Sequence, residues 1–315
     1  MTAPVGPVNR NKLGRSGVMS PLYTVFRTHN IDTLYLEWFF KSSYWHSFMY
    51  LNGDSGARAD RFSIKDNVFF DMPIPYPQLA EQAKIGSYFQ SLDNLITLHQ
   101  RKCESLKKVK KSMLQKMFPK NGESVPEIRF AGFTDDWEQR KLGEVFVEYS
   151  QKNHTELPPL TIIQGGGTVL RDESDRNLMY DKANLSNYKM VRKGDFIVHL
   201  RSFEGGLELA TNTGVISPAY HTLHGDDTDS RFYYSYFRSR KFIDNDLTPH
   251  VYGIRDGRSI DIEGMKTINI PYTSFAEQKA IGDYISNLDN LITLHQRKVE
   301  KLKNIKKSML QKMFV

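Results

Sequence analysis

Apolar residues recur at alternating steps of four and three along the C-terminal stretch of the chain. They fall at Ile281, Ile285, Leu288, Ile292, Val299, Leu302, Met309 and Met313, with His295 and Lys306 in the remaining seam positions. This spacing is the heptad seam of a long amphipathic helix. Ser274, followed three residues later by Glu277, predicts a capping box at its start. We therefore expect a helix from about residue 274 to 314, roughly 60 Å long at 1.5 Å per residue.

The same pattern occurs a second time in the middle of the chain. The sequence LDNLITLHQRK stands without a change at Leu92–Lys102 and at Leu288–Lys298. The flanks are repeated too, as AEQ at 80–82 and 276–278 and as KKSMLQKMF at 110–118 and 306–314. Two copies of one helix-forming segment make this a duplicated protein.

The two predicted helices are expected to pack against each other as an antiparallel coiled coil. The residues assigned to the seam of this spacer are Leu92, Ile96, His99, Leu106, Met113, Leu288, Ile292, His295, Leu302 and Met309. A polar pair that fixes the register explains His99 and His295 better than a metal site or a catalytic base. Leu291 and Leu294 widen the stripe, so each helix is expected to contact more than its twin. A ruler between two attached parts and an ordinary helical hairpin both fit this pattern.

The duplication extends into the globular regions that precede the helices. SGVMSPLY at Ser16–Tyr23 matches TGVISPAY at Thr213–Tyr220, and GARADR at Gly56–Arg61 matches GIRDGR at Gly253–Arg258. The stretch from about 130 to 213 has no counterpart at the front of the chain. We therefore expect a first globular domain truncated to its C-terminal half, which is either marginal, silent or completed by another polypeptide.

This organisation predicts a definite order of parts. They are a truncated globular domain at 1–75, a spacer helix at 76–119, a linker at 120–124, a complete globular domain at 125–271 and a second spacer helix at 272–315. In the complete domain, short apolar runs broken by turn residues predict a mixed sheet with a few short helices. The fold class is therefore α+β, with globular domains joined by two long antiparallel helices.

Local patterns in the complete domain predict individual elements. Lys193-Gly194-Asp195 is expected to form the turn of a strand hairpin. Phe232–Phe242, which is aromatic and basic, has the spacing of a short amphipathic helix. Another short helix, carrying Trp137 and Leu142, is expected near the start of the domain.

Composition narrows the class of protein. The chain has 315 residues, of which 39% are apolar and 12% aromatic, enough for about two globular domains. It has no run of about twenty apolar residues and no apolar signal core, so we expect a cytoplasmic protein. Cys103, the only cysteine, lies in the helical seam and is expected to serve packing. The net charge of +7 favours a polyanionic partner.

The sequence shows no persuasive catalytic or metal site. It has no Walker A loop, GxSxG elbow, HExxH motif or cysteine pair. The triple glycine at Gly165–Gly167 lacks dinucleotide-binding spacing, which favours a mobile loop over a phosphate cradle. A helix N-terminus explains the adjacent Asp135 and Asp136 more simply than a metal does.

Basic residues are the better candidates for a binding site. The candidates for DNA contact are Arg171, Lys189, Arg192, Lys193, His199, Arg201, Arg255, Arg258, Arg58 and Arg61. Several lie around the predicted hairpin, and the arginines of the glycine-rich loop recur in both globular domains. Arginine forks grip phosphates or read guanine edges, and glycines let the backbone approach a groove. A solvated basic face is the alternative.

Together these features resemble the specificity subunit of type I restriction–modification systems. The likeness rests on FTDDWEQRKLGEVF, YKMVRKGDFIV and the repeated AEQ, LDNLITLHQRK and KKSMLQKMF elements, and it spans essentially the whole chain. It implies two target-recognition domains, each reading one half of a split DNA site, on conserved helices that set the gap and dock modification subunits. The truncated domain at 1–75 departs from this pattern.

The resemblance also implies how the work is divided among subunits. Modification subunits, expected to be two, would methylate adenine with S-adenosylmethionine, and restriction or translocase subunits would use ATP and Mg²⁺. This chain would bind none of these cofactors and would be the non-catalytic reader of double-stranded DNA, with a second specificity fragment or self-association as a further expectation. The alternatives are a scaffold or decoy that holds modification subunits without reading DNA, and a nuclease acting alone. A steep salt dependence of binding separates the DNA reader from the scaffold.

Overall fold

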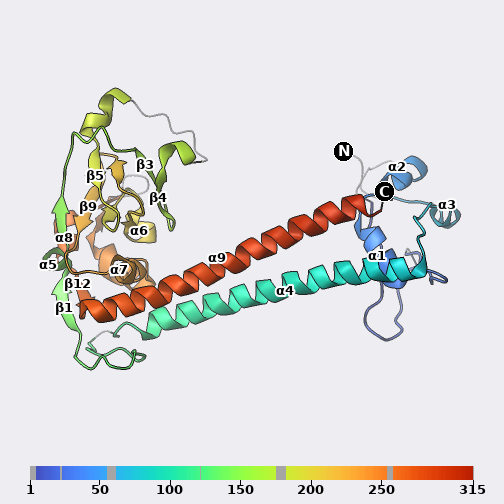
Figure 1. The fold of residues 1–315 in the computed structure, drawn as a ribbon, viewed down its shortest axis with the longest axis horizontal. Helices are drawn as coiled ribbons and strands as arrows, with labels where there is room; N and C mark the ends of the chain where they lie inside the picture. The colour runs from blue at the N-terminus through green and yellow to red at the C-terminus, as the bar shows by residue number, and fades with distance from the viewer. Residues whose placement is uncertain are drawn as a thin grey trace. The chain divides into compact units, whose positions relative to one another are not determined.

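The structure is a computed structural model that describes residues 5–21, 23–54, 62–120, 122–174, 182–253 and 258–314. The chain forms two compact units, whose elements are labelled in Figure 1. The first unit comprises 1–105 and 292–315, and the second comprises 106–291. The long helices α4 (Leu79–Lys116) and α9 (Phe275–Lys312) contribute to both. No helix within these described ranges is long and apolar enough to cross a membrane.

The first unit packs short helices against parts of the two long ones. The short helices are α1 (Thr33–Lys41), α2 (His46–Asn52) and α3 (Asp66–Phe70). Asp32 caps α1, because its carboxylate accepts the backbone N–H of Tyr35 at 2.7 Å. Every residue of α1 from Tyr35 to Phe40 is buried, so this helix lies inside the unit.

The second unit combines short antiparallel strand pairs with short helices. The strands are β1 (Glu138–Lys141), β2 (Val147–Tyr149), β3 (Leu160–Ile163), β4 (Gly167–Leu170), β5 (Lys189–Val191), β6 (Phe196–Val198), β7 (Glu208–Leu209), β8 (Gly214–Ile216), β9 (His221–His224), β10 (Val251–Tyr252), β11 (Ser259–Ile260) and β12 (Asn269–Tyr272). The largest sheet has the order β2-β9-β6-β7, and the remaining pairs are β1-β12, β3-β4, β5-β8 and β10-β11.

Short helical segments connect these strands. They are α5 (Leu142–Val145), α6 (Ser202–Gly205), α7 (Ser230–Phe237), α8 (Ile262–Lys266), the 3₁₀ turns η1 (Arg171–Glu173), η2 (Lys182–Asn187) and η4 (Thr248–His250), and the π-helix η3 (Lys241–Leu247). The mixed helix and sheet content confirms the predicted α+β class, including the two long helices. The amphipathic helix predicted within Phe232–Phe242 is confirmed as α7.

The predicted short helix carrying both Trp137 and Leu142 is wrong. Residues Glu138–Lys141 instead form β1, which pairs with β12 far along the chain, and only the four residues from Leu142 are helical. A long-range strand pair supplies hydrogen bonds that an isolated turn of helix cannot match. Trp137 therefore enters the core ahead of a strand.

Within each unit the two long helices pack through the predicted seam. In the first unit Leu92, Ile96 and Ile292 are buried, and in the second Leu288 is buried. The seam residues Leu106, Met113, Leu302 and Met309 are half-buried. Cross-helix ion pairs accompany the seam, between Lys306 and Asp93 in the first unit and between Lys110 and Asp289 in the second. Leu95, Leu98, Leu291 and Leu294, which widen the stripe, are exposed.

The two units repeat the same contacts where the long helices begin. In the first unit Gln82 accepts the Asp32 backbone N–H at 2.8 Å and donates to the Pro77 carbonyl. In the second unit Gln278 accepts the Asp229 N–H at 3.0 Å and donates to the Thr273 carbonyl. The matching glutamine thus fixes the capped start of α1 in one unit and of α7 in the other. The duplication therefore extends to individual hydrogen bonds.

Each long helix is followed by a phenylalanine that completes an aromatic core. Phe314, after α9, lies 5.4 Å from Tyr35 and 5.9 Å from Phe39, centroid to centroid, in the first unit. Phe118, after α4, lies 5.0 Å from Phe232 and 5.7 Å from Tyr236 in the second unit. Tyr35 and Phe39 follow the Asp32 cap at the same spacing as Phe232 and Tyr236 follow the Asp229 cap. The C-terminal end of each repeat is therefore a core element.

Acid is expected to destabilise the first unit through its histidine pair. His99 and His295 face each other across the seam, with 2.9 Å between their Nδ1 atoms. Partial burial and the charges of His99, Lys102 and Lys298 lower the pKa of His295. The unfolded chain then binds the proton more readily, so stability is full above the ordinary value of about 6.5 and is lost as the pH falls below it. Melting temperatures followed by circular dichroism from about pH 8 to pH 5 test this.

The matched variants for this test are His295→Gln and His29→Gln. Glutamine at 295 should flatten the decline in melting temperature on the acid side, because one titrating partner is removed. His29 is exposed, so its replacement should leave the decline unchanged. Equal pH profiles for both variants and the parent chain would contradict the role given to this pair.

Candidate nucleic-acid interface

Arg192 and Lys193 lie in the turn between β5 and β6, and both side chains are exposed. The turn is confirmed, and Gly194 adopts a positive φ of 100° within it. The predicted hairpin is wrong, because β5 pairs with β8 whereas β6 pairs with β7 and β9. The turn crosses from one sheet to another, and it presents its two cations at that crossing.

Asp195 anchors this turn through hydrogen bonds of its side chain. Its buried carboxylate accepts the Arg192 backbone N–H at 2.8 Å and the Tyr149 hydroxyl, and it lies 2.6 Å from Nδ1 of His224. Burial and the bond to Asp195 raise the pKa of Tyr149. The Arg192 guanidinium lies 5.5 Å from the centre of the Tyr149 ring. The turn is therefore anchored by its backbone, while the cations of Arg192 and Lys193 stay outside this network.

Arg171, Lys189 and His199 gather around Tyr220 instead. Lys189 donates from Nζ to the Tyr220 carbonyl at 2.6 Å, and burial lowers its pKa. The His199 ring lies 6.2 Å from the Tyr220 ring, and burial lowers its pKa as well. The guanidinium of Arg171 lies 5.9 Å from the ring of Tyr188. These predicted site residues are half-buried and positioned within the unit.

Arg201 and Arg258 flank the short helix α6. Arg201 precedes its first residue, and the Arg258 guanidinium lies 5.4 Å from the ring of Phe203 within it. Both arginines are exposed. Neither of them, nor Arg192 or Lys193, forms an ion pair with a carboxylate in the part of the chain that the structure describes. Arg58, Arg61 and Arg255, the remaining predicted residues, lie outside the described residues.

The glycine loop between β3 and β4 binds a carboxylate of the chain itself. Glu208 is fully buried and accepts the backbone N–H groups of Gly165 at 2.7 Å and Gly167 at 3.1 Å. Its carboxylate also accepts the Tyr234 hydroxyl and pairs with Arg238 at 3.1 Å. An internal anion therefore occupies the amide groups that a phosphate cradle would use.

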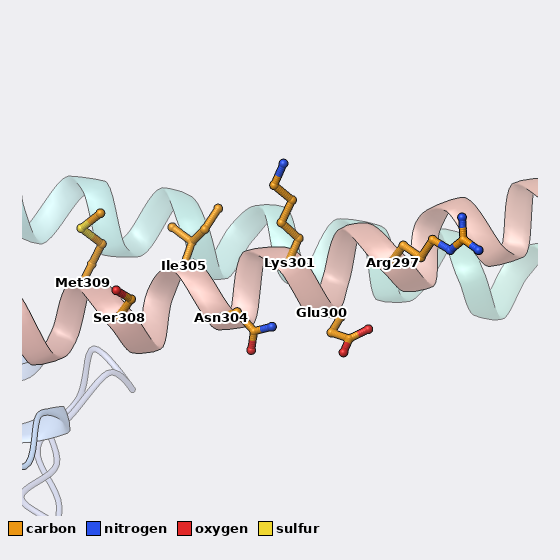
Figure 2. Close-up of a pocket in the computed structure, with 7 residues that line it drawn as sticks. All are labelled: Arg297, Glu300, Lys301, Asn304, Ile305, Ser308 and Met309. Carbon is orange, nitrogen blue, oxygen red and sulfur yellow. The ribbon is translucent and has the colours of Figure 1, made fainter. Parts of the chain in front are cut away.

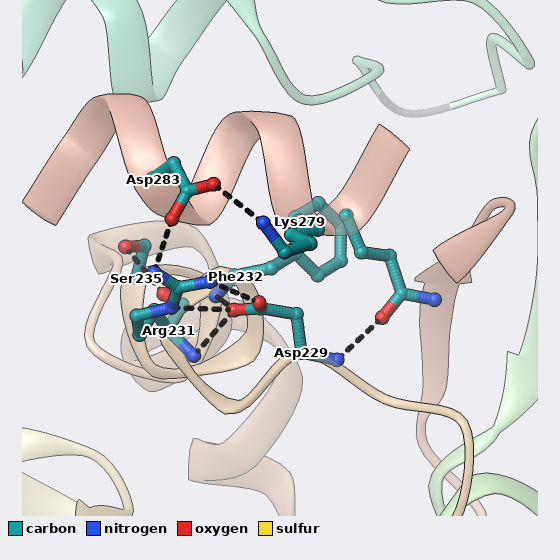
Figure 3. Close-up of polar contacts among 7 residues, drawn as sticks. Asp229, Arg231, Phe232, Ser235, Lys279 and Asp283 are labelled. Atoms are coloured by element: carbon teal, nitrogen blue, oxygen red, sulfur yellow. Dashed lines mark hydrogen bonds and ion pairs between the residues drawn. The ribbon is translucent and has the colours of Figure 1, made fainter. Parts of the chain in front are cut away.

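Two polar networks of the second unit escaped sequence reasoning. In the first, Arg231 of α7 bridges the cap residue Asp229 and Asp283 of α9, and Lys279 contacts the same Asp283 (Figure 3). The role of Arg231 could not be predicted from the sequence, because one of its two partners, Asp283, lies in a distant segment. This network fastens α7 to the start of α9.

The second network centres on Glu277, which is 1% exposed. Its carboxylate accepts Nε of Arg129 at 2.6 Å, Nε1 of Trp137 at 3.0 Å and the hydroxyl of Thr273 at 2.6 Å. The predicted capping box is therefore wrong for Glu277, because its carboxylate binds Arg129 and Trp137. Only its backbone N–H approaches the Ser274 hydroxyl, at 3.4 Å. The charged Arg129 side chain is a stronger donor to the Glu277 carboxylate than the local backbone N–H of Ser274.

A shallow hollow lies on α9 in the first unit, and Figure 2 shows the side chains around it. Its lining is Arg297, Glu300, Lys301, Asn304, Ile305, Ser308 and Met309. The lining mixes charged and apolar side chains along successive turns of one helix face. No group of three or more metal-ligating side chains was found among the described residues.

The polar and basic features of the second unit coincide with a family match. A family model described as "Type I restriction modification DNA specificity domain" matches residues 134–304, more than half of the chain. The chain belongs to this family. The match contains the β5–β6 turn, α6 and most of α9, so the exposed cations described above lie in the DNA specificity domain.

Individual relatives extend the likeness beyond this domain. The type I restriction enzyme MjaVIII specificity subunit of Methanocaldococcus jannaschii is 25% identical over 95% of this chain and 73% of its own length. The crystal structure of the HsdS subunit from Thermoanaerobacter tengcongensis has a TM-score of 0.50 at 17% identity, covering 89% of this chain and 69% of that one. The type I restriction-modification S subunit from M. genitalium has a TM-score of 0.53 at 14% identity, covering 90% and 73%. At these identities the two structures show the specificity-subunit fold.

Proposed function

We propose that this specificity subunit reads one half of a split DNA site with its second unit and docks modification subunits through its long helices. The observation that carries the proposal is that exposed cations, which form no ion pair with any described residue, lie within the DNA specificity domain, at the β5–β6 turn and beside α6. The phosphate backbone attracts such cations, and arginine forks also read guanine in the major groove. Arg192, Lys193, Arg201 and Arg258 are the residues assigned to DNA.

The three half-buried candidates receive a different role. The Lys189 ammonium donates to the Tyr220 carbonyl, and burial lowers the pKa of His199. Arg171 lies near Tyr188 beside them. We assign these residues to the support of the recognition surface, since a cation held inside the unit contributes less to phosphate attraction than an exposed one.

Exposed leucines on the long helices support the docking of partner subunits. Leu95 and Leu98 on α4 and Leu294 on α9 are each more than two-fifths exposed. All three lie in the sequence LDNLITLHQRK, which both long helices contain. Large apolar side chains on a helix surface gain free energy when a partner covers them. We propose that two modification subunits use these matching positions, one for each copy of the repeat.

Catalysis is assigned to the partner subunits. In this proposal the modification subunits supply S-adenosylmethionine and methyl transfer to adenine, and the restriction subunits supply ATP- and Mg²⁺-dependent translocation and cleavage. This chain contributes the DNA sequence preference and the spacing. A methylation assay with and without this subunit, using DNA that carries the selected site, tests this division.

Replacing Arg201 and Arg258 together by alanine is expected to weaken DNA binding. We expect a loss of about tenfold to a hundredfold in affinity and a reduction of about one to two in the slope of log affinity against log salt, because two cations leave the DNA surface. A gel-shift titration of the complex with modification subunits measures both quantities. Arg240→Ala is the control, since Arg240 is exposed in the same unit but pairs with Asp244. Unchanged affinity of the double variant would refute the assignment of α6 to DNA.

A further inference from the structure

We propose that the first unit carries a docking surface for a polypeptide segment, not supplied by the described residues, in which an arginine is followed by an aromatic residue. The surface consists of Ile74–Tyr76, Glu81 and Tyr88, and we call it the Glu81 surface. It repeats a surface of the second unit that one segment of this chain covers.

The repeats align the two surfaces residue for residue. The tripeptide Ile-Pro-Tyr stands at 74–76 and at 270–272, and the tripeptide Ala-Glu-Gln at 80–82 and 276–278. The Pro75 carbonyl accepts the hydroxyl of Tyr35, and the Pro271 carbonyl accepts that of Tyr233, which stands one position further from its helix cap than Tyr35 does. Because these contacts match, each position of the Glu81 surface has a defined equivalent in the second unit.

The glutamates at the centre of the two surfaces differ in their surroundings. Glu277 is buried under Arg129 and Trp137, which donate to its carboxylate at 2.6 Å and 3.0 Å. Glu81, its equivalent, is exposed and forms no ion pair within the described ranges of the chain. The glutamate carboxylate is therefore covered by hydrogen-bond donors in the second unit and exposed in the first.

The strand edge and the tyrosines show the same difference. In the second unit β1 pairs with β12, and the Arg140 guanidinium lies 3.7 Å from the centre of the Tyr272 ring. Phe130 lies 5.9 Å from the ring of Tyr284. In the first unit, no described strand pairs with Ile74–Tyr76, and the ring of Tyr76 is 60% exposed.

The Tyr88 position adds a recess to this surface. Tyr88, the equivalent of Tyr284, is 39% exposed. It lines a shallow hollow on α4 together with Ala83, Lys84, Ser87 and Ser91. Phe130 covers the equivalent tyrosine in the second unit, so an aromatic side chain is the natural occupant of this hollow.

The covering segment of the second unit defines the chemistry of the partner. Arg129, Phe130 and Arg140 all come from one short stretch, and the residues they contact have exposed counterparts in the first unit, namely Glu81, Tyr88 and Tyr76. The partner therefore offers an arginine followed directly by an aromatic residue and, about ten residues later, an extended basic strand. A second copy of this chain does not offer it, because its own stretch is buried in its own second unit.

Binding of a peptide with the sequence of residues 124–146 to the full chain tests the proposal. We expect saturable binding by fluorescence anisotropy, weakened about tenfold or more by Glu81→Arg, because a charge-assisted pair becomes a repulsion. A peptide carrying Arg129→Glu should recover binding to the Glu81→Arg chain. Glu104→Arg, an exposed reversal of charge on the same helix, should leave the affinity unchanged.

A photo-reactive group at the tryptophan of the peptide gives a second readout. Crosslinks should map by mass spectrometry to residues 76–88, and circular dichroism should show that the variants are folded. Absence of binding at millimolar peptide overturns the proposal, as does binding that Glu81→Arg leaves intact, because the peptide then exchanges into the second unit. Self-association that Glu81→Arg abolishes would assign the surface to a second copy and would also overturn it.

Discussion

Replacing Glu277 by alanine is expected to destabilise the second unit by about 3 to 5 kcal/mol. The substitution leaves the Arg129 guanidinium, whose side chain is 12% exposed, without the carboxylate that binds it twice. A buried charge that loses its partner retains its desolvation penalty. The indole of Trp137 loses its acceptor at the same time. Urea denaturation followed by circular dichroism measures the change in the free energy of unfolding.

The repeat supplies a control at the same helix position. Glu81→Ala should change the stability of the first unit by no more than about 0.5 kcal/mol, because Glu81 is exposed. The double variant Arg129→Ala with Glu277→Ala should recover part of the loss, since neither charge is then buried alone. Equal effects of the two glutamate substitutions would show that the pair with Arg129 is not what stabilises the unit.

Phe118→Ala is expected to destabilise the second unit by about 3 to 5 kcal/mol, the usual range for removing a large aromatic side chain from a core. The ring of Phe118 contacts those of Trp137, Phe232 and Tyr236 at centroid distances of 6.0, 5.0 and 5.7 Å. Its removal leaves a cavity where three separate segments meet. Calorimetric melting, in which we expect one transition for each unit, measures the loss of stability.

Phe314→Ala should lower the melting of the first unit and leave the second unchanged. Phe314 is the same residue of the repeat, but its ring packs on Tyr35, Phe39 and Phe89. Met313→Ala, next to it and 38% exposed, is the control and should have a small effect. A variant that shifted both melting transitions equally would contradict the assignment of each phenylalanine to one unit.

Local periodicity carried most of the fold that the sequence could predict. The seam of α4 and α9 repeats every few residues, so Leu92, Ile96 and Ile292 could be placed without knowing their partners. The α7 helix was likewise predictable, because its apolar residues recur at helical spacing. The family resemblance rested on the same repeated helix and was confirmed.

Long-range pairing explains what the sequence could not predict. Whether Glu138–Lys141 forms a helix or a strand is decided by β12, more than a hundred residues later. The turn at Gly194 could be predicted from the sequence, but no local pattern indicated that β5 and β6 pair with different strands. Which basic residues are exposed could not be predicted either. Arg192 is exposed beside Tyr149, and Lys189 is half-buried beside Tyr220, so both depend on contacts with distant segments.

The position of Phe314 has a consequence for the order in which the protein is made. Tyr35 and Phe39 leave the ribosome early, but Phe314, whose ring packs on them and on Phe89, is synthesised only after the whole second unit. Contacts across so long a stretch of chain form slowly, and an unfinished aromatic core exposes apolar surface meanwhile. The second unit, whose residues are contiguous, can fold while translation continues. The first unit can therefore become native only after every residue of the second has been synthesised.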